Sequence, residues 1–525
     1  MATLVTLAAL AALSCAAAAP LNVLLVSTVS SPSHYIWTNA LATGLLERGH
    51  RVTELVIRPP AVKHENRTSF VITAPTYGDE HGWDLEVTNV LSLWEEIPFF
   101  YSFCVESAKA AFESQAFTDL MKHLKEKKPK FDVFVLDFIM QEPMIGLNSV
   151  IGRVPVVAFT AFNMPEEVLQ AMGSPFVASM LPFQGVGADG GVPMTFRERA
   201  DNAFKWLTYK LYAHYVDRPR INQDIAKWFP GAPSLEELEK DLAISLVNTS
   251  PPLHGGMPTV PAVVEVGGLQ AQPPKPLPKD LLDWVDAKNA PHGFIYMAFG
   301  TNVKAKMIRK ERRDAILRAF GRLKQRVLWK YEDDDIHDKL PPNVKVAKWL
   351  PQNDILGHPN IRCFVSHNGG LSTQEASYHG VPIVGVPFFV DQIGYSHKIE
   401  KIGIGRRVHY QSITEDSFFE TVFDVANNPK YRENMQKVRQ ALRDQKETPL
   451  ERAVWYIEYA ARTGGAPNLR SPGLQLRWYE LYMLDLLGAA LLAVVLFVWL
   501  VSRMVAAFVG LLFCTAPKRA KAKTQ

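Results

Sequence analysis

The stretch "FVSHNGGLSTQEASYHG", in the second half of the chain, contains groups that could bind a phosphate. A short apolar run leads into His367 and the pair Gly369 and Gly370, and a helix is expected to begin directly after them. Backbone N–H groups at a helix start, left bare by the glycines, act with the helix dipole to attract anions. Ser372 adds a donor on the helix, and Thr301 adds one at a neighbouring strand end. The pattern predicts a site for a phosphate-bearing ligand, although the glycine pair alone could be only a tight turn.

The residues around this stretch could bind the other parts of a nucleotide sugar. Glu375 lies three residues beyond the helix serine, on the same face, and could accept hydrogen bonds from ribose hydroxyls. Trp349 and Gln352 leave a strand end, where an indole can stack on a base and an amide can bind its edge. Asp391 and Gln392 follow the next apolar run and could hold sugar hydroxyls. Each residue alone could equally belong to core or surface, but together they predict a nucleotide-sugar pocket.

A histidine and an aspartate in the first half could carry acid–base chemistry. His34 follows the first apolar run in "SPSHYIW", at or just before a helix start. Asp137 ends the run "FDVFVLD", and the carboxyl ends of parallel strands meet at one sheet edge. A carboxylate that accepts from one imidazole nitrogen fixes the tautomer and leaves the other nitrogen free to take a proton. A lone histidine is more often a surface or satisfied core residue, so the prediction depends on the pair.

Two series of apolar strands alternating with helices must position these residues. In the first half, strands are expected at 22–28, 51–57, 131–138 and 154–160, with a helix that Gly49 ends. The rhythm begins again after 292, with strands expected within 293–302, 326–332, 344–350, 363–370 and 381–389. Short continuous apolar runs are typical of strands buried on both faces of a parallel sheet. The chain is therefore expected to form two doubly wound α/β lobes.

The segments between and within the lobes are less regular. Residues 270–282, which include "QAQPPKPLPKD", are expected to form an extended proline-rich linker between the lobes. The aromatic helix expected at 202–216 is interpreted as core or domain surface, with a membrane-leaning or acceptor-lining role as the alternative. The acidic run "EDDD" at 332–335 could suggest a metal site, but a solvated loop between strands is the preferred interpretation.

Both ends of the chain indicate a membrane protein that enters the secretory pathway. Residues 1–19 are apolar and end in small residues, as in a signal peptide. The region 481–514 contains the uncharged run "LLGAALLAVVLFVWLV" and is expected to span a bilayer. The basic tail 515–525 is then cytoplasmic by the positive-inside rule. Its Lys521 and Lys523 resemble a dilysine endoplasmic reticulum signal, so we expect a single-pass membrane protein with lumenal lobes.

The remaining composition restricts partners and cross-links. The formal charge of +4 includes a basic tail rather than a basic face, which makes nucleic acid a poor candidate partner. Asn66 and Asn248 begin glycosylation sequons, and Pro251 disfavours use of the second. Outside the terminal segments only Cys104 and Cys363 remain, so disulfides do not hold the fold together, and whether these two pair stays open.

The stretch "WLPQNDILGHPNIRCFVSHNGGLSTQEASYHGVPIVGVPFFVDQ" resembles the signature of the UDP-glycosyltransferases, and the similarity covers essentially the whole chain. The resemblance implies the GT-B fold, in which two Rossmann-like lobes face a cleft. The acceptor would bind mainly in the N-terminal lobe, 20–269, and the UDP-sugar in the C-terminal lobe, 283–445. Helices in 446–480 would return toward the N-terminal lobe. The implied contacts are Trp349 and Gln352 with uracil, Glu375 with ribose, Thr301, His367 and Ser372 with the diphosphate, and Asp391 and Gln392 with the transferred sugar.

The resemblance also implies a mechanism. His34 would remove the proton from an acceptor hydroxyl as its oxygen attacks the anomeric carbon, while Asp137 supports the charged imidazole. UDP would leave from the opposite face, so an α-linked donor would give a β-glycoside. A helix-terminus phosphate site can stabilise the leaving diphosphate without a metal, and we expect no metal and no other cofactor.

The donor, acceptor and assembly are less defined. Similarity to invertebrate members favours UDP-glucose as donor and small lipophilic molecules, such as phenolics or steroids, as acceptors. UDP-glucuronate is the alternative donor, because the signature does not separate the two. A silent carrier of lipophilic ligands or a membrane scaffold is the alternative from another class, and the presence of His34 and Asp137 argues against it. The oligomeric state, including a homo-oligomer, stays open.

Overall fold

The computed structural model describes residues 19–73, 105–139, 141–181, 183, 194–301, 303–388 and 391–514. The chain divides into two units, residues 1–471 and 472–525, and each is described by itself. The first unit contains two parallel β-sheets, and we call the part built around each sheet the N-lobe and the C-lobe. The expected signal peptide, Cys104 and the basic tail lie outside the described residues.

The N-lobe is built on a parallel seven-stranded sheet in the order β3-β2-β1-β4-β5-β6-β7. The expected strands at 22–28, 51–57, 131–138 and 154–160 are present as β1, β2, β4 and β5. Residues 67–71, 242–247 and 263–265 form further strands that the sequence analysis missed. The strands are β1 (Asn22–Ser27), β2 (Arg51–Val56), β3 (Arg67–Val71), β4 (Val133–Asp137), β5 (Val156–Thr160), β6 (Leu242–Val247) and β7 (Val263–Glu265).

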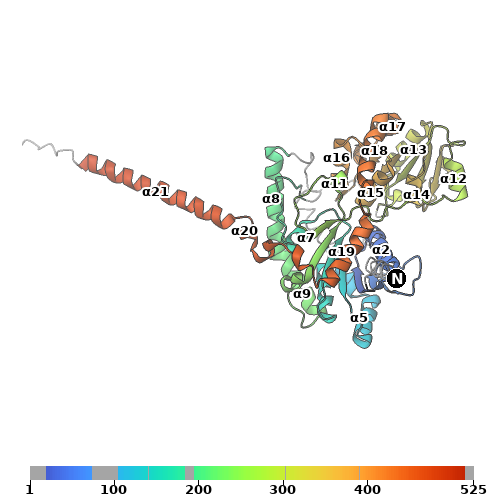
Figure 1. Ribbon diagram of the computed structural model, residues 1–525. Coiled ribbons are helices and arrows are strands. Elements are labelled where there is room, and N and C mark those ends of the chain that lie inside the picture. Colours follow the sequence, from blue (N-terminus) through green and yellow to red (C-terminus); the bar gives the residue numbers. More distant parts are fainter. Residues whose placement is uncertain are drawn as a thin grey trace, which may run out of the picture. The chain divides into compact units, whose positions relative to one another are not determined.

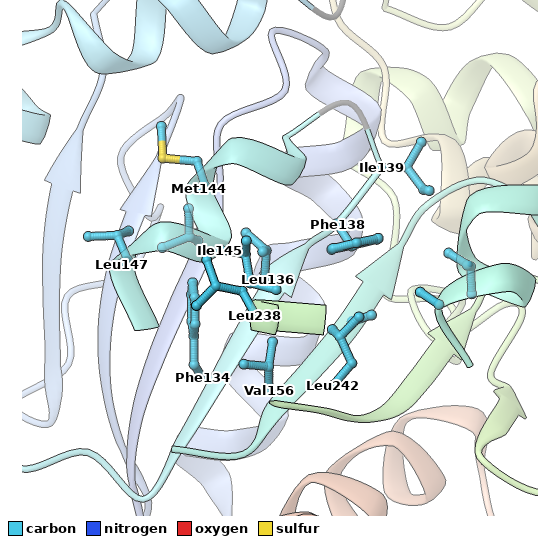
Figure 2. Close-up of a cluster of buried hydrophobic side chains, with 14 of the residues drawn as sticks. Phe134, Leu136, Phe138, Ile139, Met144, Ile145, Leu147, Val156, Leu238 and Leu242 are labelled. Atoms are coloured by element: carbon cyan, nitrogen blue, oxygen red, sulfur yellow. The ribbon is translucent and has the colours of Figure 1, made fainter. Parts of the chain in front are cut away.

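Alternate strand residues of the N-lobe sheet belong to two separate hydrophobic cores. Leu24 and Val26 of β1 lie in one core, whereas Val23 and Leu25 lie in the other. Figure 2 shows part of the first core, where strand side chains meet the short helical turn that carries Met144. Both faces of the sheet are therefore covered, as a doubly wound fold requires.

Helices of the N-lobe follow the strands in chain order (Figure 1). Proline near the first position of α2 is compatible with a helix start, because its missing N–H is not needed there. The elements are α2 (Pro32–Glu47), α5 (Gln115–Lys127), η1 (Glu142–Gly146), α6 (Leu147–Val150), α7 (Glu166–Ala171), α8 (Phe196–Tyr212), η2 (Ala213–Asp217), α9 (Arg218–Trp228), α10 (Leu235–Leu238), η3 (Glu239–Asp241) and α11 (Pro251–His254).

The aromatic helix expected at 202–216 is α8, and a π-helical turn continues it. A capping box of Thr195 and Glu198 begins it. Trp206 and Tyr209 pack against the N-lobe core, which agrees with a core interpretation for one face. The opposite stripe is exposed at Phe196, Phe204, Leu207, Leu211 and Tyr215.

The C-lobe is built on a parallel six-stranded sheet in the order β10-β9-β8-β11-β12-β13. All expected strands are present, and the short edge strand β13 was missed. Alternate residues again divide between two cores: Ile295 and Met297 lie in one, Phe294 and Tyr296 in the other. The strands are β8 (Phe294–Ala298), β9 (Arg326–Lys330), β10 (Val344–Ala347), β11 (Ile361–Ser366), β12 (Ile383–Gly385) and β13 (Gly405–Arg407).

The helices of the C-lobe cover both faces of its sheet (Figure 1). Ile316 of α13 and Phe418 of α17 lie in one core, and Ile399 of α16 and Met435 of α18 lie in the other. The elements are α12 (Lys279–Val285), η4 (Ala305–Met307), α13 (Lys310–Gly321), η5 (His337–Lys339), α14 (Gln352–Leu356), α15 (Gly370–His379), α16 (Asp391–Lys401), η6 (Tyr410–Ser412), α17 (Glu415–Asn427) and α18 (Pro429–Arg443).

The chain passes between the lobes twice. The first crossing is the proline-rich linker, which is extended only as far as Pro278, because helix α12 begins at Lys279 within the expected linker range. The second follows α18 and leads into α19 (Pro449–Arg462), which lies beside α2 of the N-lobe (Figure 1). Ala453, Val454 and Ile457 of α19 complete the second N-lobe core. A short turn, η7 (Pro467–Leu469), follows.

A buried carboxylate joins α19 to the N-lobe. Glu458, with 4% of its side chain exposed, accepts hydrogen bonds from Arg48 at 3.0 Å and from His50 Nε2 at 3.0 Å. The other nitrogen of His50 accepts from the backbone N–H of Leu21 at 3.1 Å. These contacts connect the start of β1, the end of α2 and the returning helix.

The second unit contains η8 (Pro472–Gln475), α20 (Trp478–Leu481) and the long helix α21 (Leu484–Cys514). Residues 484–513 are long enough to cross a membrane, with a mean hydropathy of 2.6 over their most apolar window and none of that window buried. The helix fits a single-pass anchor, since about 20 apolar residues span a bilayer.

Candidate active site

The two residues expected to carry acid–base chemistry lie in direct contact. His34 stands in the first turn of α2 and Asp137 is the last residue of β4, at the carboxyl edge of the N-lobe sheet. His34 Nδ1 lies 2.8 Å from Asp137 Oδ2, and the side chains are 4% and 1% exposed. Since a carboxylate accepts hydrogen bonds, Nδ1 carries the hydrogen and Nε2 keeps its lone pair. The pair can therefore accept a proton at Nε2.

Two neighbours hold the pair in place. Ser27, the last residue of β1, donates from Oγ to Asp137 Oδ2 at 2.8 Å. Phe162 packs edge-on against the imidazole of His34, with ring centroids 5.0 Å apart. Asp137 receives hydrogen bonds from both Ser27 and His34, and Phe162 packs against one side of the imidazole. Together these contacts hold the imidazole in its orientation. Ser27 was not predicted from the sequence, although it ends a buried strand just as Asp137 does.

The expected phosphate-binding residues surround the start of α15. Gly369 is the residue before the helix and Gly370 is its first residue. A carbon added at Gly369 would lie 2.5 Å from His367 Nε2, and one added at Gly300 would lie 2.6 Å from Cε1 of the same ring. Both glycines are therefore needed for the close approach of the imidazole. Thr301 follows Gly300 directly and is exposed at this strand end.

Burial keeps His367 neutral. Desolvation, helped by the charge of Lys330, lowers the pKa of the imidazole to about 3. Its Nδ1 is buried and has no hydrogen-bond partner among the described residues. Because a neutral imidazole has one N–H, His367 can donate one hydrogen bond to an anion beside the start of α15.

Gln352, Ser372 and Glu375 form one hydrogen-bonded group. Nε2 of Gln352, at the start of α14, lies 3.1 Å from Ser372 Oγ and 2.8 Å from Glu375 Oε2. The serine and glutamate share a face of α15, one turn apart. Burial raises the pKa of Glu375 to about 7. A carboxylate with this pKa is partly ionised at neutral pH and can accept hydrogen bonds from hydroxyl groups.

Asp391 lies against the same helix start. Its Oδ2 accepts from the backbone N–H of Gly370 at 3.1 Å. Burial raises the pKa of Asp391 to about 6, opposed by that hydrogen bond and by the charge that His34 carries when its imidazole is protonated. The electrostatic interaction between Asp391 and His34 shows that this C-lobe carboxyl group lies close to the His34–Asp137 pair of the N-lobe. Gln392 is buried, and its Oε1 accepts from the backbone N–H of Phe388 at 2.9 Å.

The aromatic residue expected to stack on a base is available for it. Trp349 follows β10 and is 73% exposed, which is unusual for so large an apolar side chain. It stands three residues before Gln352 in the chain, and its indole is open to solvent. An exposed indole next to polar groups is suited to stack on a planar ligand.

The acidic run at 332–335 forms ion pairs with basic side chains. Glu332 contacts Lys330 at 2.5 Å, Asp334 contacts Lys348 at 2.8 Å, and Asp335 contacts Arg313 at 2.5 Å. Among the residues that the structure describes, no group of three His, Cys, Asp or Glu side chains is arranged to hold a metal ion. The run is a partly exposed, charge-paired loop.

The structure disfavours use of the Asn248 sequon, as Pro251 already does in the sequence. Asn248 is 0% exposed, and its Nδ2 donates to the carbonyl of Ala161 at 2.7 Å, so the folded lobe cannot accommodate a glycan there. Asn66 stands half-buried at the start of edge strand β3, where Thr68 is exposed. Cys363 is buried in the C-lobe core, and its pairing with Cys104 is untested because the latter lies outside the described residues.

Comparisons of the sequence and of the fold with known proteins all point to glycosyltransferases. The family model described as "UDP-glucoronosyl and UDP-glucosyl transferase" matches residues 22–519. The chain is 30% identical over 487 residues to UDP-glycosyltransferase UGT5 of Dactylopius coccus, covering 89% of this chain and 88% of the relative. It is 28% identical over 494 residues to UDP-glucosyltransferase 2 of the same organism, covering 91% and 92%. The glycosyltransferase VinC in complex with DTDP has the same fold, with a TM-score of 0.58 at 16% identity, over 85% of this chain and 100% of that structure.

Proposed function

The chain belongs to the UDP-glucoronosyl and UDP-glucosyl transferase family, and we propose that it transfers glucose from UDP-glucose to a hydroxyl group of small lipophilic acceptors, such as phenolics, steroids or xenobiotics. The observation that carries the proposal is the buried contact of His34 with Asp137, beside the C-lobe residue Asp391. A silent carrier would have no use for a buried acid–base pair at this edge.

In the proposed reaction, Nε2 of His34 takes the proton of the acceptor hydroxyl as its oxygen attacks the anomeric carbon. The new bond joins the acceptor oxygen to that carbon, and the bond from the carbon to the diphosphate oxygen breaks. Asp137 accepts from Nδ1 and stabilises the imidazolium that forms. Because the nucleophile and leaving group are on opposite faces, an α-linked donor gives a β-glycoside.

The C-lobe residues are proposed to hold the donor. Trp349 stacks on uracil, Gln352 binds its edge, and Glu375 accepts from the ribose hydroxyls. Thr301, His367, Ser372 and the backbone N–H groups at Gly369 and Gly370 bind the diphosphate, with the N–H of Gly370 giving up its hydrogen bond to Asp391 Oδ2. Asp391 with Gln392 binds the sugar. The support is their gathering around the start of α15, where N–H groups and the helix dipole favour negative charge.

We propose that transfer needs no metal and no other cofactor. The helix start and the neutral imidazole supply hydrogen-bond donors for the negative charge that develops on departing UDP. Three of the four carboxylates at 332–335 form ion pairs with basic side chains: Glu332 with Lys330, Asp334 with Lys348 and Asp335 with Arg313.

Glucose is proposed as the sugar because of the likeness to the Dactylopius coccus relatives, one of which is named a glucosyltransferase. Glucuronate is the second candidate, since the family description includes both sugars. The proposed location is the endoplasmic reticulum membrane, with α21 as anchor and the lobes in the lumen.

The test is a donor panel on microsomes that contain the full chain. UDP-glucose, UDP-glucuronate, UDP-galactose and UDP-N-acetylglucosamine are each supplied with pooled phenols and steroids, with and without EDTA. We expect glycosides from UDP-glucose, undiminished by EDTA and lost in His34→Ala. Product from UDP-glucuronate alone would transfer the assignment to that donor. UDP binding without product from any donor would favour the carrier.

A further inference from the structure

A buried hydrogen-bonded group joins the two lobes outside the residues discussed so far. Tyr395, on α16 of the C-lobe, is 2% exposed. Its hydroxyl lies 2.5 Å from Oδ1 of Asn163 and 2.9 Å from Nε2 of His254. Asn163 follows strand β5, and His254 ends α11 after strand β6, so both partners lie on connections between N-lobe strands, although Leu253 of α11 itself packs in the C-lobe core. One phenol thus contacts two N-lobe segments that are 91 residues apart in the chain.

One arrangement of the hydrogens satisfies the contacts of Tyr395 with Asn163 and His254. Tyr395 has one hydroxyl hydrogen and donates it to the carbonyl oxygen of Asn163. His254 then donates from Nε2 to the phenol oxygen. Its Nδ1 accepts from the backbone N–H of Ser250 at 3.0 Å and lies 3.1 Å from the carbonyl oxygen of the same residue. Burial lowers the pKa of His254 to about 3, so the single-hydrogen imidazole that this arrangement needs is the stable form.

The group lies between the acid–base pair and the donor residues. Asn163 directly follows Phe162, whose ring packs on the imidazole of His34. Tyr395 is one helical turn beyond Asp391. A carbon added at Gly370 would lie 3.1 Å from the hydroxyl of Tyr395 and 3.3 Å from Asp391 Oδ2. The phenol therefore contacts the start of α15 on one side and the strand end beside His34 on the other.

We propose that Tyr395 is a positioning residue for glycosyl transfer: with Asn163 and His254 it sets the distance between His34 and the sugar held at the start of α15. This inference rests on the proposed function. The phenol binds neither substrate. It fixes the two lobes in the arrangement that places the acceptor oxygen against the anomeric carbon, where a misplacement of about 1 Å can cost roughly a hundredfold in rate.

The test is Tyr395→Phe in the full-length protein, which keeps the ring and removes only the hydroxyl. We expect kcat to fall roughly tenfold or more, while the affinity for UDP changes less than about twofold. Tyr431→Phe is the matched control, because Tyr431 is also buried but its hydroxyl donates to Asp424 within the C-lobe, at 2.8 Å. A wild-type kcat in Tyr395→Phe, or an equal loss in both variants, overturns the proposal. So does a parallel loss of UDP affinity.

A double-mutant cycle identifies the partner. Asn163→Ala removes one of the two contacts of the phenol and should lower kcat no more than Tyr395→Phe does. The double variant should be no worse than Tyr395→Phe, because the contact with Asn163 is already absent from that variant. Additive losses overturn the proposal.

A readout independent of turnover separates this inference from the proposed function. With UDP bound, amide hydrogen exchange in segments 161–171 and 391–401 should be faster in Tyr395→Phe than in wild type and Tyr431→Phe. If exchange in both segments is unchanged in Tyr395→Phe, the proposal that Tyr395 holds the two lobes together is overturned. Absence of product from every donor in wild-type protein would instead overturn the proposed function, while the exchange result still decides the contact.

Discussion

His34 and Asp137, 103 positions apart in the chain, meet with Nδ1 and Oδ2 separated by 2.8 Å. The contact forms because β1 and β4 are neighbours in the sheet, which brings the start of α2 and the end of β4 to one edge. The pair fixes which imidazole nitrogen can take a proton. The same edge carries Asn163, through which the N-lobe reaches Tyr395 of the C-lobe.

Replacing Asp137 by Asn should leave the fold intact and remove most of the activity. An amide has the shape of the carboxylate but does not stabilise the imidazolium, and its nitrogen cannot accept from Nδ1. We expect transfer to fall about a hundredfold to ten-thousandfold with an unchanged Kd for UDP, measured by product formation and calorimetry. Ser27→Ala, which keeps the carboxylate, should lose much less. Equal losses would mean that orientation, and not charge, is the main role of Asp137.

Glu375→Gln should stabilise the protein above neutral pH. The pKa of Glu375 is raised from its usual value near 4.5 to about 7, so the unfolded chain releases this proton at lower pH than the folded one. Stability therefore decreases as pH rises from about 4.5 to 7 and is level above that. The variant should remove this decrease, on the order of 3 kcal/mol, in urea unfolding followed at pH 5 and pH 8. If the free energy of unfolding depended on pH identically in both proteins, burial would not be raising the pKa of Glu375.

The same substitution should weaken UDP binding in a pH-dependent manner. At pH 8 the ionised carboxylate accepts charge-assisted hydrogen bonds from ribose hydroxyls, and loss of this charge should raise Kd about tenfold. At pH 6 the side chain is mostly protonated, and the two proteins should bind UDP almost equally. Isothermal titration measures both values. The phosphate of UDP also titrates in this range, so any pH dependence shared by both proteins belongs to the ligand.

Trp349→Ala should separate donor binding from stability. Stacking of a base on an aromatic ring contributes about 1–3 kcal/mol, so UDP affinity should fall roughly tenfold to a hundredfold. The melting temperature should change little, because the side chain is 73% exposed. Trp455→Ala, on α19 and 43% exposed, is the control and should keep wild-type affinity. Affinity lost equally in both variants would contradict the assignment of Trp349.

A chain that ends at Ser471 should no longer behave as an integral membrane protein. It keeps both lobes and lacks α21. After alkaline carbonate extraction, the full chain should remain in the membrane pellet and the shortened chain should appear in the supernatant. A shortened chain that still sediments would indicate a second membrane contact, and the exposed stripe of α8, which includes Phe204 and Leu211, would be the first place to look.

Much of the fold was predictable because strands buried on both faces leave continuous apolar runs. β1, with the sequence NVLLVS, is an example. Three of the four strands that escaped prediction lack this signal: β3 is an edge strand without a fully buried residue, and β7 and β13 are three residues long. The fourth, β6, has the sequence LAISLV and is buried throughout, so its apolar run did carry the signal. The end of the linker was also missed, because "KDLLDWV" forms a helix whose Leu281 and Val285 pack in the C-lobe core.

The candidate site was predictable where its parts are close in sequence. The spacing from Gly369 to Glu375 shows a helix start and one helix face without any tertiary information. The contact of Tyr395 with His254 joins residues 141 positions apart, and neither has a local pattern that distinguishes it from a core residue. The burial of Asn248 was also not predictable from local sequence, because the three residues of a sequon are the same in an exposed loop and at a buried strand end.

Because α19 completes the N-lobe core, that lobe is not a continuous piece of sequence. Its second core lacks Ala453, Val454 and Ile457 until the whole C-lobe has been synthesised. On the ribosome, the N-lobe therefore cannot reach its final packing before the C-lobe has emerged. The same geometry constrains recombination: a chimera joined only at the linker pairs an N-lobe with a foreign α19. Exchanges that retain function should carry the segment after residue 448 together with the N-lobe that it packs against.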